Sequence, residues 1–511
     1  PASAMDALKL HDRLVLDVVQ TVLEVTNAQL TPCLIAEVAL PLDHGGLGFR
    51  SLAGTCHLSY LASVAAVIQQ WRRFVSDSHP LLQSWCSQPA VSPTDPAQLC
   101  FNLRKGLQSA LDLAVDHVRE AYSLPSLSVQ QGRAAFVTSR EVPFALETMP
   151  RKLEELLAFQ HFKKLQATLN NCKAKVDLNR FKATFLLNDA DKAQFLSKSQ
   201  FGSAGFLKAT PSDRSLSLSN KDLTLSLRLY LRLPLLSYLE LPQDLNCFCT
   251  RMARQGISHQ LTEAHLLVCH GGKVMTTRHN ALANVVSDMV KAAQLAPIME
   301  QLASEGQDAR LRFDVSIDRY DGSSRDFKCD VTVVNPCSKH LVAHAAKTAR
   351  YAADAKAKTK ISKYSRFLHL QDDFLALVFE TFGAFHPDVF KLINILSKRV
   401  GNVPPLSATW TCPTFTSYWL QRLSCCLWRE NARTVTTISI NTKNSYCHSA
   451  NTSLLIAAPV QQQVQQVRQV LANLTIAPVQ ATSGLQQQDP VPVSTTASAQ
   501  VPVSASDPES G

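Results

Sequence analysis

Apolar residues recur at helical spacing through much of the first 170 positions, and this pattern predicts a large α-helical amino-terminal portion. Over 58–71 the apolar side chains follow one another at intervals of three or four residues, which places them on one face of a helix. The glycine-rich stretch 40–51 predicts the turn before this helix, because glycine adopts backbone conformations that other residues avoid. A loop rich in Pro, Ser and Asp at 92–96 separates this region, 1–95, from a second helical one, 96–236.

Alternation of apolar and polar residues predicts strands farther along the chain. Leucine occupies every second position of 223–233, which favours a strand and leaves a short helix as the alternative. Similar alternation over 310–335 predicts a hairpin, and the apolar run 374–379 predicts another buried strand. Helical spacing returns at about 280–295, from near His340, at 389–398 and at 417–433. We therefore expect a mixed α/β fold, with a small sheet and flanking helices in the carboxy-terminal half.

The composition changes at about residue 451. Residues 451–511 are rich in Gln, Val, Pro, Ser and Ala and contain no aromatic residue. Such a segment buries too little apolar surface to offset the entropy lost on ordering, so we expect a disordered tail. The whole chain has a formal net charge of +10, and the tail carries one Arg against three acidic residues, which leaves +12 for the first 450 residues. This excess favours a polyanionic partner, although solubility alone would also explain it.

Part of the positive charge is concentrated within twenty residues. The basic side chains of this stretch are Lys347, Arg350, Lys356, Lys358, Lys360, Lys363 and Arg366. A stretch of this kind forms either a surface for nucleic acid or an ordinary solvated helix face. Within it we predict Lys356 and Lys363 as contacts to nucleic acid.

The cysteines indicate a reducing environment. Fourteen of them are spread along the chain, without the density of a disulfide-bonded scaffold. Most stand alone among apolar residues, as Cys100 and Cys172 do, and predict reduced core thiols in an intracellular protein. No apolar run reaches the roughly eighteen residues that cross a bilayer, so no membrane partner is expected. The chain opens with Pro1, and we expect it to be a fragment whose start is missing.

Two short-spaced pairs of residues predict a zinc knuckle. Zinc prefers four thiolate or imidazole ligands in a tetrahedron, supplied as two pairs that a loop brings together. A helix beginning near Leu261 would place the second pair on one face, because positions i and i+4 are neighbours. His259 and His270 are alternatives for the histidine, and buried thiols beside surface histidines are the alternative for the whole cluster. The predicted ligands are Cys247, Cys249, His265 and Cys269.

The hairpin carries two aspartates that predict a second metal site. If the strands are symmetric about Gly322, in a turn at 321–323, then Asp314 and Asp330 are directly opposite, since each lies eight residues away. Carboxylates so close repel each other unless a cation lies between them, which indicates a divalent ion such as Mg²⁺. An ordinary surface hairpin with two solvated aspartates is the alternative.

A cation for catalysis has to come from another segment, because Thr332 occupies the position two after Asp330. Two lysines qualify, Lys347 and Lys360, and each precedes a tyrosine by four residues, so that each pair would share a helix face. A lysine beside the metal would stabilise negative charge that develops during phosphodiester cleavage. Glu380 is either a residue at a strand end or an additional acid near the metal.

Taken in order, these segments resemble the carboxy-terminal part of a reverse transcriptase polyprotein from a non-LTR retroelement. That family carries a zinc knuckle and a restriction-enzyme-like endonuclease of the PD-(D/E)XK type. The resemblance covers roughly residues 35–430. The matching segments are 40–51, the knuckle, Arg278-His279-Asn280, Asp314, 330–336, 360–364 and 380–383.

The resemblance implies the organisation of the chain. It implies a helical region after a polymerase thumb at 1–95, a helical linker at 96–236, the knuckle and its following helix at 237–295, a restriction-like endonuclease at 296–400 and a helical segment at 401–450. No Tyr/Phe-x-Asp-Asp polymerase motif occurs in this chain. The reverse transcriptase activity is therefore expected upstream of Pro1.

The resemblance also implies an activity. In that family the endonuclease nicks one strand of target DNA, and the exposed 3′ hydroxyl primes copying of the element's RNA, which implies DNA and RNA as partners and a nuclear location. The metal-binding aspartates correspond to Asp314 and Asp330, and the helix lysine and tyrosine to Lys360 and Tyr364. Arg278 and His279 would contact the nucleic acid backbone or simply begin a helix. The family has proline before the first aspartate, where this chain has Phe313. The alternative is a nucleic-acid-binding module that no longer cleaves.

Overall fold

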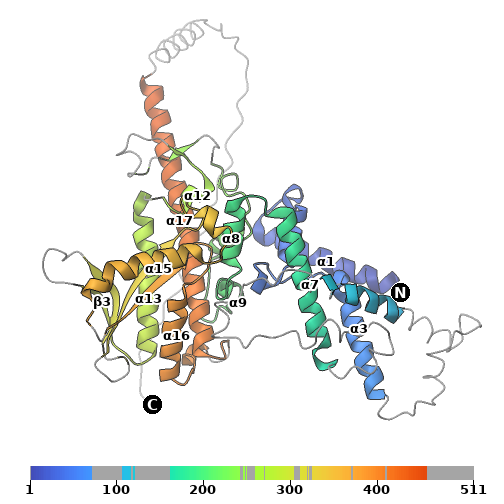
Figure 1. Ribbon diagram of the computed structural model, residues 1–511. Coiled ribbons are helices and arrows are strands. Elements are labelled where there is room, and N and C mark those ends of the chain that lie inside the picture. Colours follow the sequence, from blue (N-terminus) through green and yellow to red (C-terminus); the bar gives the residue numbers. More distant parts are fainter. Residues whose placement is uncertain are drawn as a thin grey trace, which may run out of the picture. The chain divides into compact units, whose positions relative to one another are not determined.

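The computed structural model describes residues 2–71, 106–116, 119–120, 162–241, 245–247, 249, 259–269, 271–303, 311–318, 320, 325–369, 372–408 and 411–456 (Figure 1). The chain divides into two compact units, Pro1–Tyr446 and Cys447–Gly511. The boundaries predicted near residues 95, 236, 295 and 400 all lie within the first unit. The loop at 92–96 and the turn at 321–323 lie outside the described residues.

A four-stranded mixed sheet forms the centre of the carboxy-terminal half. Its strands lie in the order β3 (Pro297–Leu302), β4 (Arg312–Ile317), β5 (Phe327–Val334) and β6 (Asp373–Glu380). β3 and β4 are antiparallel, as are β4 and β5, whereas β5 and β6 are parallel. The mixed α/β fold, the hairpin and the strand at 374–379 are thereby confirmed, while β3 is an addition that the sequence pattern does not predict.

Helices cover both faces of this sheet. On one face, α13 (Val274–Ala292) and α16 (Pro387–Arg399) share a hydrophobic core with side chains such as Cys329 and Leu377. On the other, α15 (Tyr351–Tyr364) packs small alanines against β6 and lies across the sheet in Figure 1. Since both faces are covered, β4 is buried along Phe313–Ile317, aspartate included.

The amino-terminal portion is helical where it is described. Its helices are α1 (Ala2–Leu23), α2 (Pro32–Ala39), α3 (Leu52–Trp71), a helix at 106–116, α7 (Phe162–Phe185), α8 (Asp189–Lys198), α9 (Gly205–Lys208) and α10 (Asn220–Tyr230). The predicted turn follows α2, and Gly46 is packed so closely there that an added Cβ would lie 2.1 Å from the Leu40 carbonyl oxygen. Only glycine fits this position.

The strand that we predicted at 223–233 is wrong, because the segment forms α10. Ser219 begins the helix by accepting a hydrogen bond from the Asp222 N–H, which is a standard helix cap. All residues from Thr224 to Tyr230 are buried. A helix that is covered on every side needs no polar face, so the alternation of leucine with other residues carries no information about the period.

Shorter elements complete the described part. They are β1 (Asn246–Cys247), β2 (His259–Gln260), α12 (Glu263–Leu266) and α14 (Val342–Ala345), with 3-10 turns at Asn27–Gln29, Leu42–His44, Gly271–Lys273, Ser365–Phe367 and Leu406–Ala408. The helix predicted from near His340 is confirmed as α14 and α15.

The last described helix, α17 (Phe415–Ile456), is longer than the predicted 417–433. It also continues six residues into the segment that we expected to be disordered from 451, and residues 457–511 lie outside the described part. Among the described helices, none combines the length and the apolar character required to cross a bilayer.

Candidate metal knuckle and acidic centre

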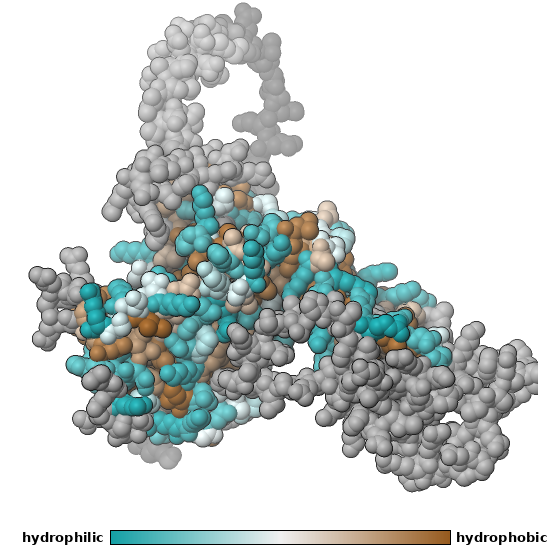
Figure 2. All heavy atoms as spheres, viewed as in Figure 1, coloured by the Kyte–Doolittle hydropathy of each residue, from teal (hydrophilic) through white to brown (hydrophobic). Residues whose placement is uncertain are grey.

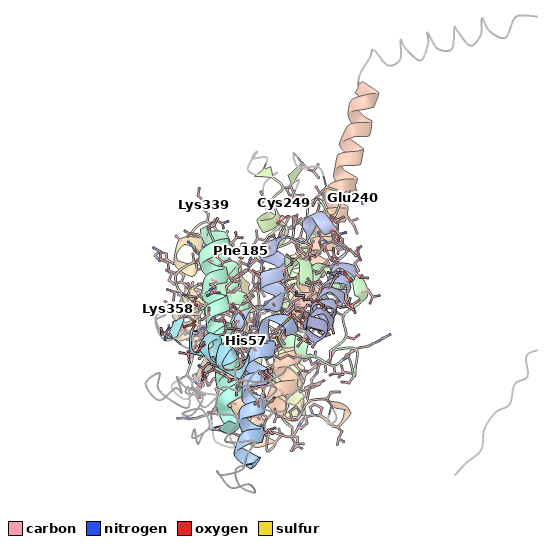
Figure 3. The ribbon with its side chains drawn as sticks, turned by 90° about the vertical axis from the view of Figure 1, so that its right-hand side faces the viewer. His57, Phe185, Glu240, Cys249, Lys339 and Lys358 are labelled. Carbon is pink, nitrogen blue, oxygen red and sulfur yellow. The ribbon has the colours of Figure 1, made fainter. Side chains whose placement is uncertain are left out.

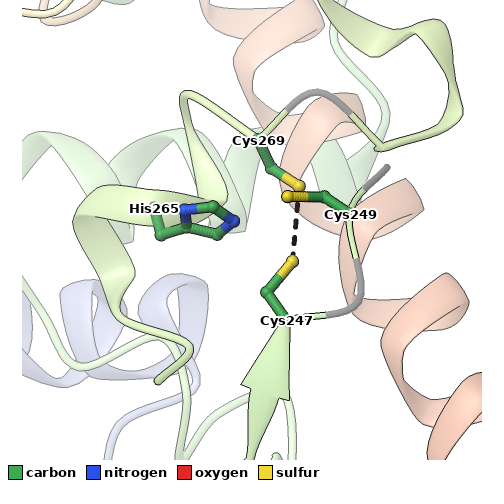
Figure 4. Close-up of side chains that lie close together, drawn as sticks. All are labelled: Cys247, Cys249, His265 and Cys269. Carbon is green, nitrogen blue, oxygen red and sulfur yellow. Dashed lines mark hydrogen bonds between the residues drawn. The ribbon is translucent and has the colours of Figure 1, made fainter. Parts of the chain in front are cut away.

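The predicted knuckle residues lie together. β1 carries Cys247 and pairs with β2, while α12 carries His265. The ligand atoms of Cys247, Cys249, His265 and Cys269 all lie within 4.8 Å of one another, and the sulfurs of Cys247 and Cys269 are 3.5 Å apart. Figure 4 shows the imidazole of His265 turned toward the three sulfurs.

The chemistry of this cluster fits a metal ion such as zinc. Three buried sulfurs and an imidazole are a ligand set that zinc prefers. Nε2 of His265 is buried and, in the described part of the chain, has no hydrogen-bond partner, although buried polar atoms are normally paired. A proton shared with Cys269 lowers the pKa of Cys247. A metal ion would satisfy the sulfurs and the imidazole together.

One detail of the predicted knuckle is wrong. We expected His265 and Cys269 on one helix, but α12 ends at Leu266 and Cys269 follows in the next turn. The loop, rather than a helix face, brings the two residues together. His259 is outside the cluster of ligand atoms, and the other alternative, His270, is outside the described residues.

The knuckle packs against α17. The three cysteines and Gly271 line a small cavity of about 50 Å³ together with Ile438, Asn441 and Thr442 of that helix. In Figure 3, Cys249 lies beside α17. The Cys/His cluster therefore belongs to the same body as the sheet, to which it is joined through a helix whose middle part lies in the hydrophobic core.

Arg278 has a structural role in this protein. Its side chain is only 1% exposed, and its guanidinium donates to Oδ1 of Asn431 at 2.8 Å and to the carbonyl oxygen of Leu267 at 3.3 Å. Asn431 in turn donates to the carbonyl oxygen of Thr381, at the end of β6. Burial of this kind contradicts our prediction of a contact to nucleic acid. Arg278 instead connects α13, α17 and the turn that precedes Cys269.

We expect Arg278→Met to lower the free energy of unfolding by about 2–5 kcal/mol, because it leaves Asn431 Oδ1 and the Leu267 carbonyl oxygen buried without a donor. Urea unfolding of the full chain measures the loss. Arg433→Met is the matched control, since Arg433 lies on α17 with a side chain 58% exposed and pairs with Glu430, a contact worth about 0–1 kcal/mol. Equal losses in the two variants would contradict the structural role.

The hairpin has the predicted register, and the Asp314 carboxylate bonds to the backbone of the opposite strand. Val315 pairs with Cys329 and Ile317 with Phe327, so the strands are symmetric about position 322. The pairing ends at Val315, however, and the Asp314 carboxylate accepts the N–H of Val331 at 2.5 Å. Its other oxygen lies 3.2 Å from Nε2 of His279 on α13. That contact raises the pKa of His279.

Asp330 of β5 bonds to two side chains of α15. Nζ of Lys360 lies 2.9 Å from Oδ1 and 2.8 Å from Oδ2 of Asp330, and the Tyr364 hydroxyl donates to Oδ1 at 2.8 Å. Burial raises the pKa of Tyr364, and the Asp330 charge raises it further, so the phenol stays protonated. The predicted lysine and tyrosine therefore both contact the second aspartate.

Phe313, which stands where the resembling family has proline, packs in the same place. Its ring lies 5.2 Å from that of Tyr364, which also stacks on Phe374 at 5.1 Å. The three rings hold the Tyr364 hydroxyl between Asp330 and the Arg312 carbonyl oxygen. Phe313 thus contributes to the position of the tyrosine.

Among the described contacts, none of the remaining predicted residues bonds to Asp314 or Asp330. Lys347 is exposed and precedes α15, so it shares no helix with Tyr351 as we had proposed it would. On α15, Lys356 is half-buried and Lys363 is exposed, with its ammonium 5.4 Å from the centre of the Tyr364 ring. Glu380 is a buried residue at the end of β6, where it accepts the Ala353 N–H, and burial raises its pKa to about 7.

One functional candidate was missed. Glu300 of β3 lies with His279 and Asp314 in a second group of ligand atoms within 4.8 Å of one another. No alternation over 297–302 marks β3 as a strand, so nothing in the sequence placed Glu300 beside the aspartates.

Comparison with known proteins adds no assignment. No model of a known protein family matches this chain, and no curated protein is significantly similar to it. The functional interpretation therefore depends on the geometry of the two clusters and on the resemblance of the segments.

Proposed function

We propose that this chain carries a metal-dependent DNA endonuclease and is the carboxy-terminal part of a retroelement reverse transcriptase protein. The observation that supports this proposal most directly is the meeting of Lys360 and Tyr364, one turn apart on α15, at the Asp330 carboxylate. A lysine and a tyrosine from α15 and an acid from β5 converge on one point.

The charges of this centre suit phosphodiester hydrolysis. Asp314 would help to hold a divalent cation, which when bound activates a water molecule and polarises a phosphoryl oxygen. Water attacks phosphorus, the bond to the 3′ oxygen breaks, and the products are a 5′ phosphate and a 3′ hydroxyl. Lys360 would stabilise the charge that develops on the phosphoryl oxygens. Tyr364, which stays protonated, would hold Asp330 and Lys360 in place.

The surface around α15 suits a polyanion. Lys358 and Lys363 of α15 are exposed, as is Lys339 before it, and Figure 3 shows Lys339 and Lys358 at the margin of the ribbon. The face in Figure 2 is largely hydrophilic, with smaller hydrophobic areas between. DNA bound by such lysines releases counterions, so its affinity would fall steeply with salt concentration.

Nicking of supercoiled DNA tests the proposal. We expect the full chain to convert supercoiled plasmid to the open circle with Mg²⁺ or Mn²⁺, and Asp330→Asn to lower the rate about 10–100-fold, because it loosens Lys360 and Tyr364. Asp318→Asn is the control, since Asp318 is an exposed carboxylate just beyond β4, and it should nick at the wild-type rate.

Two outcomes would exclude the endonuclease. Cleavage that survives Asp330→Asn unchanged would mean that this centre does not catalyse it. Salt-sensitive DNA binding without cleavage by the wild-type chain would instead support the alternative of a nucleic-acid-binding module that is no longer active.

A further inference from the structure

Three potential ligands of a cation meet beside the proposed catalytic centre. They come from three different elements: His279 from α13, Glu300 from β3 and Asp314 from β4. One ligand atom of each lies within 4.8 Å of the other two, and His279 is half-buried, Glu300 exposed and Asp314 buried. Asp330 is not a member of this group. The cluster is thus open to solvent on the side of Glu300 and fixed on the side of Asp314.

The backbone of each element places its residue at this position. The pairs Met299–Val315 and Gln301–Phe313 flank Glu300 and Asp314 and place them directly across from each other. Glu300 itself has a φ of 53°, a left-handed conformation that residues with a side chain rarely adopt. The buried Arg278, hydrogen-bonded to Asn431, fixes the turn of α13 that carries His279.

The donor atoms available are one imidazole nitrogen and two carboxylates. Oδ2 of Asp314 is occupied by the Val331 N–H, whereas Oδ1 faces only Nε2 of His279 among the contacts of the described residues. Ligands of one imidazole and two carboxylates, with further positions open to water, form a site for a divalent first-row transition ion. Mg²⁺ favours oxygen ligands and is bound less well when nitrogen replaces one of them.

We propose that His279, Glu300 and Asp314 bind the catalytic cation, and that this cation is a transition ion such as Mn²⁺ in preference to Mg²⁺. This inference deepens the proposed function. The catalytic role of the cation rests on the proposed endonuclease activity, whereas the binding of the cation does not. Asp330 then serves as the residue that positions Lys360 and Tyr364 beside the cation, rather than as one of two equal ligands. These residues would hold the ion between α13 and the sheet edge at β3, with Glu300 on the exposed side.

Binding of Mn²⁺ can be measured apart from cleavage. We expect the zinc-loaded full chain to bind Mn²⁺ at this site, seen as loss of the free Mn²⁺ signal in electron paramagnetic resonance, and to keep it in a tenfold excess of Mg²⁺. His279→Gln and Glu300→Gln should each weaken the binding at least about tenfold. Glu300 is exposed, so its replacement tests the site without a change in the core.

Two control variants make the result specific. His340→Gln removes an exposed imidazole outside the cluster and should leave Mn²⁺ binding unchanged. Asp330→Asn should also leave it within about threefold while it slows nicking, because a positioning residue lies outside the ligand set.

The outcomes separate this inference from the proposed function. Wild-type Mn²⁺ affinity in both His279→Gln and Glu300→Gln, or equal competition by Mg²⁺, would overturn the site even if the chain nicks DNA. Loss of Mn²⁺ binding in Asp330→Asn would restore Asp330 as an equal ligand and overturn the division of roles. Tight Mn²⁺ binding by a chain that never nicks DNA would overturn the endonuclease, and with it the catalytic role, while the metal site remains.

Discussion

Replacing Lys360 with methionine is expected to slow DNA nicking by about 10²–10³-fold, the loss that follows removal of one group that stabilises transition-state charge. Lys360 is the ammonium that contacts Asp330, at 2.8–2.9 Å. Methionine keeps the length and much of the packing of the lysine stem on α15, so the change removes mainly the charge. The measurement is the single-turnover rate of plasmid nicking at saturating metal.

The control for this prediction is the lysine that the sequence could not distinguish from it. Lys347→Met removes the same charge from an exposed position before α15 and should change the nicking rate less than about threefold. Binding of DNA should weaken only slightly in either variant, because each removes at most one phosphate contact. A large loss of nicking in Lys347→Met, with normal nicking by Lys360→Met, would show that Lys347 and not Lys360 is the catalytic lysine.

Local sequence patterns predicted those parts of the centre that one segment can specify by itself. The register of β4 and β5 follows from the spacing of the two aspartates about Gly322, and the pairs Val315–Cys329 and Ile317–Phe327 agree with it. The knuckle residues follow from two short-spaced pairs in the same way. In both cases the information lies within one short segment of the chain, 314–330 or 247–269.

Features that depend on tertiary packing were not predictable. Lys347 and Lys360 have the same spacing to a tyrosine, and only the course of the chain after α14 decides which of them reaches Asp330. Arg278 looks like a basic residue at the start of a helix, yet Asn431, 153 positions away, supplies its partner. Glu300 lies on a strand with largely exposed residues and no alternation. Each of these contacts joins separate segments of the chain, and the local sequence of one segment does not indicate its contact with the other.

The short elements of the knuckle illustrate why a bound metal ion would contribute more to their stability than their local sequence does. β1 and β2 have two residues each and α12 has four, and elements so short are not stable alone. They surround the cluster of three thiols and one imidazole, which lies against Ile438 of α17. Binding energy at such a site is folding energy.

Removal of zinc is therefore expected to unfold the knuckle. The purified chain should contain about one zinc ion in the four-ligand site, and its loss should withdraw a share of the ~10–16 kcal/mol that zinc supplies to small zinc-binding folds. After chelation, Cys247, Cys249 and Cys269, now 1–5% exposed, should react with a thiol reagent, and amides of 259–269 should exchange with solvent. Cys269→Ser should give the same result without a chelator.

Cys337→Ser is the matched control, because Cys337 is a half-buried free thiol outside the cluster. It should leave the zinc content and the exchange of 259–269 unchanged. The sheet should remain folded in both variants, since its four strands bond to one another and α15 packs on β6. A chain that holds full zinc after Cys269→Ser, or that protects 259–269 equally well without zinc, would show that packing on α17 alone folds this segment.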